Sequence, residues 1–102
     1  MHLFDIVEVW LFSMQKCLRT SGVVATFQRS SVDRSNPSCT LNMRWRDQEI
    51  DLSIWDSGEA ELIEGSSLGP TNQVHFDDVR NRNDLGHIMS KLVEFSVLTR
   101  SE

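Results

Sequence analysis

The stretch CTLNMRWRDQEIDLSIWDSGEAELI, residues 39–63, decides the fold of this chain. Apolar and polar residues alternate along 41–46 and again along 50–55, which is the period of a β-strand with one buried face. The two runs therefore predict two adjacent antiparallel strands. The residues that we expect in the core are Leu41, Met43, Trp45, Ile50, Leu52 and Ile54.

A two-residue turn at Asp47-Gln48 would join the two runs into a hairpin. The resulting register is attractive because it places apolar residues opposite apolar residues and bases opposite acids. The expected apolar pairs are Trp45 with Ile50, Met43 with Leu52 and Leu41 with Ile54, and the expected charged pairs are Arg46 with Glu49 and Arg44 with Asp51.

A second hairpin is predicted at Asp56-Ser57-Gly58. A three-residue hairpin loop usually has glycine third, in the left-handed region, and Gly58 occupies that place. The register again matches core residues and brings acids beside Trp55 on the polar face. The expected pairs are Trp55 with Glu59, Ile54 with Ala60, Ser53 with Glu61 and Leu52 with Leu62.

The flanking segments predict two amphipathic helices. Residues 3–19 carry an apolar stripe at helical spacing, and Gly22 follows where a left-handed capping residue belongs. Val9 and Phe12 fall off this stripe, and the sequence favours core over a contact surface for both. Residues 83–98 predict the second helix, with Asn83 as its N-cap. The expected stripes are Leu3, Val7, Trp10, Met14 and Leu18, then Leu85, Ile88, Met89, Leu92 and Val93.

The remaining segments complete a sheet. Residues 23–29 read as a strand, 30–38 as a polar loop, 65–72 as a Gly-Pro loop and 73–78 as a short last strand with Val74 and Phe76 inward. We therefore predict an α+β fold: an antiparallel meander of four to five strands with the N-terminal and C-terminal helices packed on one face. The whole chain, 1–102, is expected to be a single domain.

The charge is distributed unevenly along the chain. The net charge is −5, yet residues 47–79 hold nine acids and no lysine or arginine, whereas residues 1–46 have a balance of +3. An acidic protein does not suit general nucleic-acid binding, which needs bases to neutralise phosphate. Such an asymmetry bears on partners and association rates.

The N-terminus and the cysteines indicate the compartment. The first residues lack a basic signal-peptide region, and Asp5 and Glu8 interrupt the apolar run, so we expect neither a signal peptide nor a membrane span. Cys17 and Cys39 match no zinc or redox spacing, and we expect two buried, reduced thiols. These observations favour a cytoplasmic protein.

The sequence shows no convincing catalytic arrangement. His75 stands near Asp77 and Asp78, but this spacing is a weak indication of a metal site. There is no phosphate-binding glycine loop and no nucleophile motif. The many carboxylates are expected on a solvated sheet face rather than in a buried setting that would separate their pKa values. We expect no enzyme activity, no cofactor and no metal.

Trp55 shifts the interpretation of the acidic segment from a merely solvated face to a binding surface. Both hairpin registers turn it outward among acids, where a tryptophan suits a binding hot spot. Stacking on Arg44 or Arg46 is the alternative that we weigh against partner contact, and partner contact is favoured. The candidate partner-binding residues are Asp51, Trp55, Asp56, Glu59, Glu61, Glu64, Asp77 and Asp78.

The segment LSIWDSGEAELIE resembles the strand-turn-strand core of the TriTu-type immunity proteins, which accompany bacterial polymorphic and contact-dependent growth-inhibition toxins. The aromatic N-terminal helix and HFDDVRNRNDL before the last helix agree with that family over roughly residues 3–95. The resemblance implies a cytoplasmic antitoxin that binds a cognate toxin domain, in many cases a basic nuclease. From the charge and the N-terminal sequence, we expect no nucleic-acid or membrane partner.

Two other functions remain open from the sequence. The chain could be a small homo-oligomeric scaffold or regulator that self-associates through Val9 and Phe12. A more distant alternative is a metal-dependent hydrolase built on His75, Asp77 and Asp78.

Overall fold

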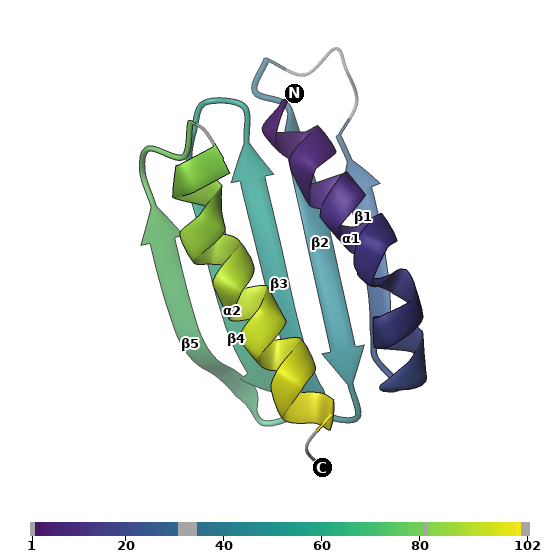
Figure 1. The fold of residues 1–102 in the computed structure, drawn as a ribbon. Helices are drawn as coiled ribbons and strands as arrows, with labels where there is room; N and C mark the ends of the chain where they lie inside the picture. Colours follow the sequence, from purple (N-terminus) through teal and green to yellow (C-terminus); the bar gives the residue numbers. More distant parts are fainter. Residues whose placement is uncertain (1, 31–34, 81, 101–102) are drawn as a thin grey trace.

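The fold is a five-stranded antiparallel meander with two helices on one face (Figure 1). The computed structural model describes residues 2–30, 35–80 and 82–100. The strands follow one another in sequence order across the sheet, so β1 and β5 are its edges, and the predicted α+β class is confirmed. The elements are α1 (Leu3–Thr20), β1 (Val24–Arg29), β2 (Ser38–Trp45), β3 (Gln48–Trp55), β4 (Ala60–Ser66), β5 (Gly69–Phe76) and α2 (Arg82–Arg100).

The hydrophobic core lies between the sheet and the two helices. In Figure 1, α1 lies in front of β1 and β2, and α2 lies in front of β3 and β4. Every second residue of β2, β3 and β4 points toward this layer, as the alternation predicts, and the inward residues away from the strand ends at the Arg46 turn and the β4–β5 turn are buried. The predicted core is confirmed for Leu41, Met43, Ile50, Leu52, Ile54 and Leu62, which are all at most 1% exposed.

Trp45 is only half-buried, so its predicted place in the core is wrong. It is the last residue of β2 and packs against the margin of the core, where the sheet ends. The Arg46 guanidinium carbon lies 4.4 Å from the centre of its ring, a cation–π contact that covers the side chain from solvent.

The predicted register of the first hairpin is wrong by two residues. Trp45 pairs with Gln48, Met43 with Ile50 and Leu41 with Leu52, so Arg46 and Asp47 form the loop. The expected charged pairs change accordingly: Arg44 lies opposite Glu49, and Asn42 lies opposite Asp51. Because a shift of two preserves side-chain direction, every residue keeps its predicted face. The loop position with positive φ falls on Arg46 (φ 56°), and no glycine marks it in the sequence.

The second hairpin has the predicted geometry. Gly58 has φ 99°, and its amide donates to the Trp55 carbonyl at 3.0 Å, while the Trp55 amide donates to the Glu59 carbonyl at 2.9 Å. Gly58 is itself buried, and the Val79 amide donates to its carbonyl at 2.7 Å. This turn therefore ties the β3–β4 hairpin to the segment before α2.

We expect Gly58→Val to lower the free energy of unfolding by more than about 1 kcal/mol, because a β-branched residue resists positive φ. A Cβ at this position would also stand 3.5 Å from the Val79 carbonyl oxygen, which leaves its two branches little space. Thermal unfolding measures the effect. Gly86→Ala is the control, since Gly86 lies in α2 with nothing within 4 Å of an added Cβ, and should keep or raise Tm. An unchanged Tm for Gly58→Val would contradict the turn geometry.

The predicted loop at 65–72 is wrong, because β4 and β5 extend through it. Only Ser67 and Leu68 lie between the strands, and β5 begins at Gly69 (φ 118°). A Cβ on Gly65 would stand 3.0 Å from the Gly69 carbonyl oxygen, so this hairpin needs glycine there. Asn72 pairs with Glu64 and Pro70 with Gly65, which leaves Thr71 as the extra residue of a β-bulge.

The other strand predictions hold with changed limits. β5 ends at Phe76 rather than at 78, and Val74 and Phe76 point inward as expected, each half-buried. Ser38, predicted as the last residue of the loop 30–38, is the first residue of β2. Residues 31–34 of that loop lie outside the described residues.

Helix α1 has the predicted core-facing stripe. Val7 and Leu18 are buried, the other members of the stripe are half-buried, and Gly22 follows the helix with φ 80°. Phe4 is also buried, which the stripe did not include. The favoured core placement of Val9 and Phe12 is wrong: they are 55% and 78% exposed. Both lie on the side of the helix that faces away from the sheet.

Helix α2 begins one residue earlier than predicted. Asn83 therefore lies inside its first turn rather than at the N-cap. Leu85, Ile88 and Leu92 are buried, as expected, whereas Val93 is 39% exposed and does not belong to the core stripe. Neither described helix is long and apolar enough to cross a membrane.

The two cysteines are free thiols in different environments. Cys39 is buried in β2, and desolvation raises the pKa of its thiol to about 12. Cys17 is exposed on α1, so the prediction of two buried thiols is wrong for this residue.

Candidate protein-binding face

The face of the sheet opposite the helices is uncovered by any described element. We call it the open face; it is formed by the side chains that alternate with the buried ones on each strand. No described helix lies behind the sheet in Figure 1. The open face comprises Val24, Thr26 and Gln28 from β1, Ser38, Thr40, Asn42 and Arg44 from β2, Glu49, Asp51, Ser53 and Trp55 from β3, Glu61 and Ile63 from β4, and Gln73 and His75 from β5.

Carboxylates occupy the middle of the open face. Asn42 on β2 donates from Nδ2 to Glu49 Oε1 at 2.6 Å and to Asp51 Oδ1 at 2.7 Å, so one amide bridges two acids of the neighbouring strand. On the other side, Gln73 Nε2 donates to Glu61 Oε1. These amides hold the carboxylates in place without neutralising their charge. Each carboxylate has a second oxygen that can accept a bond from a partner.

Trp55 lies at the end of the open face, beside the second hairpin. It is half-buried, lies opposite Ser38 and precedes the turn that leads to the exposed Glu59. The alternative of stacking on arginine is wrong. Arg46 covers Trp45 instead, and Arg44 lies opposite Glu49, six residues along the strand from Trp55 and so about 20 Å away.

The structure brings together only part of the predicted set. Asp51, Trp55 and Glu61 share the open face, and Glu59 stands at its rim. The exposed Asp77 continues from β5, where its Oδ1 lies 2.9 Å from His75 Nε2.

Three predicted residues lie elsewhere. Asp56 is in the hairpin turn, where its Oδ1 lies 2.7 Å from His2 Nε2. Asp78 is paired with Arg80 beyond the end of β5. Glu64 lies opposite Ile50, on the face that the helices cover. Since Leu62 points inward, Glu64 two residues later must do so as well.

Some residues of the open face were missing from the predicted set. Ile63 lies between Asp51 and Gln73 and adds an apolar surface among the acids. Its direction follows from the inward Leu62, so strand alternation could have identified it. Glu49 is likewise on the face by alternation. The bridging role of Asn42, by contrast, depends on a register that the sequence did not reveal.

The chemistry available here is recognition of cations and hydrogen-bond donors. The acids Glu49, Asp51 and Glu61 of the face are half-buried. Over residues 2–30, 35–80 and 82–100, no group of three or more His, Cys, Asp or Glu residues could hold a metal ion.

Comparison with known proteins adds no family. No protein-family model, no curated protein and no solved structure matches this chain.

Proposed function

We propose that this chain is a cytoplasmic immunity protein that binds a basic toxin domain through the open face and neutralises it. The observation that carries the proposal is a whole sheet face left uncovered by the described elements, with amide-held acids in its middle and a tryptophan at its end. The sequence resemblance to the TriTu-type immunity proteins supplies the kind of partner.

Electrostatics supports a basic partner. Among the described residues, three acids stand on the open face with Arg44 as its only arginine or lysine, and Glu59 adds a charge at the rim. Such a field attracts a basic partner and accelerates its association, but repels nucleic-acid phosphates. A nuclease toxin has the complementary charge because it must bind those phosphates.

The arrangement of the acids supports binding over catalysis. General acid–base catalysis needs carboxyl groups whose environments push their pKa values apart. On the open face the acids share a solvated surface and accept bonds from neutral amides of Asn42 and Gln73. The free thiols fit the reducing compartment in which an immunity protein meets a delivered toxin.

The proposal is tested with the toxin C-terminal domain encoded next to this chain. The purified chain should capture that domain in a one-to-one complex and abolish its activity, and expression should protect cells against it. A chain with no such neighbour, or one that neither binds nor protects, would contradict the proposed function.

Reversing Glu59 and Glu61 to lysine should slow association and flatten its dependence on salt, since charges at a rim act mainly on the on-rate. Surface-plasmon kinetics at two salt concentrations measure this. Glu94→Lys on α2 is the control, because Glu94 is exposed on the helix side of the molecule. If Glu94→Lys slows association as much, per reversed charge, as the reversal of Glu59 and Glu61 does, the association rate depends on net charge and not on the open face.

One observation favours the second candidate, a homo-oligomeric scaffold. Phe12 and Val9 are large apolar side chains exposed on α1, away from the open face. Self-association is compatible with toxin binding and concerns a different surface.

A further inference from the structure

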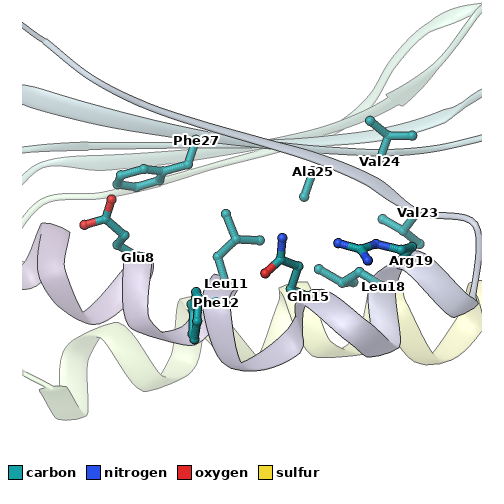
Figure 2. A pocket seen from close by; sticks show the side chains of 10 residues that line it. All are labelled: Glu8, Leu11, Phe12, Gln15, Leu18, Arg19, Val23, Val24, Ala25 and Phe27. Atoms are coloured by element: carbon teal, nitrogen blue, oxygen red, sulfur yellow. The ribbon is translucent and has the colours of Figure 1, made fainter.

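A groove runs between α1 and the edge strand β1. Its volume is about 490 Å³, and Figure 2 shows Leu11 and Gln15 rising from the helix toward Ala25 and Phe27, which descend from the sheet. The Phe12 side chain lies at the rim of this groove and is directed away from the sheet. The groove thus combines apolar side chains from a helix with those of an edge strand.

The backbone of β1 is available for pairing along this edge. The Ser30 amide donates to the Ser38 carbonyl. Hydrogen-bonded residues alternate along an antiparallel ladder, so the backbone groups of Gln28, Thr26 and Val24 also bond to β2. By the same alternation, the amides and carbonyls of Ala25, Phe27 and Arg29 point away from β2. No described strand pairs with this edge. An exposed edge strand is a template for another strand.

The charged residues of α1 have a self-complementary order. Phe12 stands near the middle of the helix, acids lie on one side of it and bases on the other. Glu8 and Lys16 are each four residues from Phe12, and Asp5 and Arg19 are each seven residues from it. These spacings place all five on one side of a helix. An antiparallel copy of the same helix matches acids to bases at both ends.

The helix and the strand are bonded to each other at both ends. Arg29 Nη2 donates to Asp5 Oδ1 at 2.8 Å and to Glu8 Oε1 at 2.9 Å, which aligns one end of β1 with the start of α1. At the other end, the Val23 amide donates to the Leu18 carbonyl at 2.8 Å. Thr26 is the middle residue of the strand segment between these two ties, and Phe12 lies near the middle of the helix segment between them and below Phe27 in Figure 2. One two-fold axis can therefore pass close to the centres of both elements.

We infer that two copies of this chain associate about such an axis, with β1 paired antiparallel to β1 and α1 beside α1. Ala25 of each copy exchanges backbone bonds with Phe27 of the other, and Thr26 meets Thr26 on the axis. Phe12 of each copy leaves solvent by packing on the rim of the other groove. Glu8 comes opposite Lys16, and Asp5 opposite Arg19, within reach of these long side chains. The isologous contact closes and leaves no free β1 edge.

A second copy fits this surface better than an unrelated partner. A partner of one charge sign would meet one half of α1 and be repelled by the other half, whereas the antiparallel copy satisfies both. The contact is far from the acids of β3 and β4, so the inference does not depend on the proposed function. It is tested with the chain alone.

The first test measures mass by sedimentation over a range of concentrations, for the parent, Phe12→Asp and Leu68→Asp. Leu68 is the matched control, since it is 97% exposed at the tip of the β4–β5 hairpin. The parent should be a dimer, Phe12→Asp should weaken the dimer at least about tenfold, and Leu68→Asp should not. A monomeric parent at about 100 μM, or a dimer that Phe12→Asp leaves intact, would overturn the inference.

The second test fixes the register by disulfide trapping in a Cys17→Ser background. Thr26→Cys should form an intermolecular disulfide on mild oxidation, because directly opposite residues of a non-hydrogen-bonded pair have close Cβ atoms. Gln28→Cys, two residues along on the same face, should not, since its two copies would stand about 13 Å apart. Trapping at Gln28 and not at Thr26, or at neither position, would overturn the proposed pairing.

The charge order gives a third test that does not rely on apolar contacts. Glu8→Lys and Lys16→Glu should each weaken the dimer, and the two together should restore most of it, because the swap recreates the opposite charges across the axis but not the bond from Arg29 to Glu8. Failure of the double variant to recover would contradict the antiparallel arrangement of α1. Circular dichroism of each variant verifies that it is folded.

Discussion

Leu52→Ala is expected to lower the free energy of unfolding by about 2–5 kcal/mol, the range for truncating a fully buried leucine in a packed core. Leu52 lies at the centre of the sheet, between Leu41 and Leu62, and is 1% exposed. The loss includes the cavity left behind, because neighbouring strands hold the surrounding side chains in place. Equilibrium denaturation by urea measures the change.

Ile63→Ala is the matched control for this prediction. Ile63 follows Leu62 on β4 but points to the open face, where solvent replaces the lost methyl groups. We expect it to cost less than about 1.5 kcal/mol. If the two substitutions had equal effects, the open face would be covered, and the proposed binding surface would not exist in the free chain.

Trp55→Ala is expected to weaken binding of the toxin domain by about 2 kcal/mol or more, mostly through faster dissociation. A half-buried tryptophan at the end of the open face has a large apolar surface to remove from water when a partner docks. The variant should remain folded, because Trp55 points away from the core. Dissociation kinetics and growth protection are the measurements.

Phe12→Ala separates the two exposed aromatic surfaces. Phe12 lies on α1, which packs on the face of the sheet opposite Trp55. The Phe12→Ala variant should therefore bind the toxin domain as the parent does. Binding that is lost with Phe12→Ala and retained with Trp55→Ala would move the toxin interface to the helices and remove the role of the open face.

The arrangement of the sheet was accessible from the sequence because alternation is a robust property of strands. The hairpin at Gly58 was predicted with its register, since a glycine marks the one position that needs positive φ. The hairpin at Arg46 carries no such mark, and a register two residues away satisfied the apolar pattern equally well. Charge pairing did not discriminate, because the acids of β3 are held by Asn42 rather than by an arginine.

Two other features depended on information that a single pattern does not contain. Gly65 and Pro70 suggest a loop, yet they lie opposite one another in a hairpin where close backbone approach and a bulge require them. Helical spacing predicts which side of α1 faces the core. It does not predict how much of the helix circumference the sheet buries. Phe12 points away from the sheet in Figure 2, so no strand covers it, and it is 78% exposed.

The candidate site was predictable as a face more than as a set of residues. Alternation placed Asp51, Trp55 and Glu61 together, and its consistent use would have added Ile63 and moved Glu64 to the covered side. The pairing of Asp56 with His2 joins residues far apart in sequence, and no local pattern indicates it.

The most direct test of the central claim is an NMR titration of the labelled chain with its toxin domain. The account predicts that the Ile63 methyl groups and the Trp55 indole N–H shift or broaden first, while the methyl groups of Ile50 and Ile54, buried on the covered face, change little. Shifts centred on Val9 and the Trp10 indole, with Ile63 and Trp55 unaffected, would contradict binding through the open face.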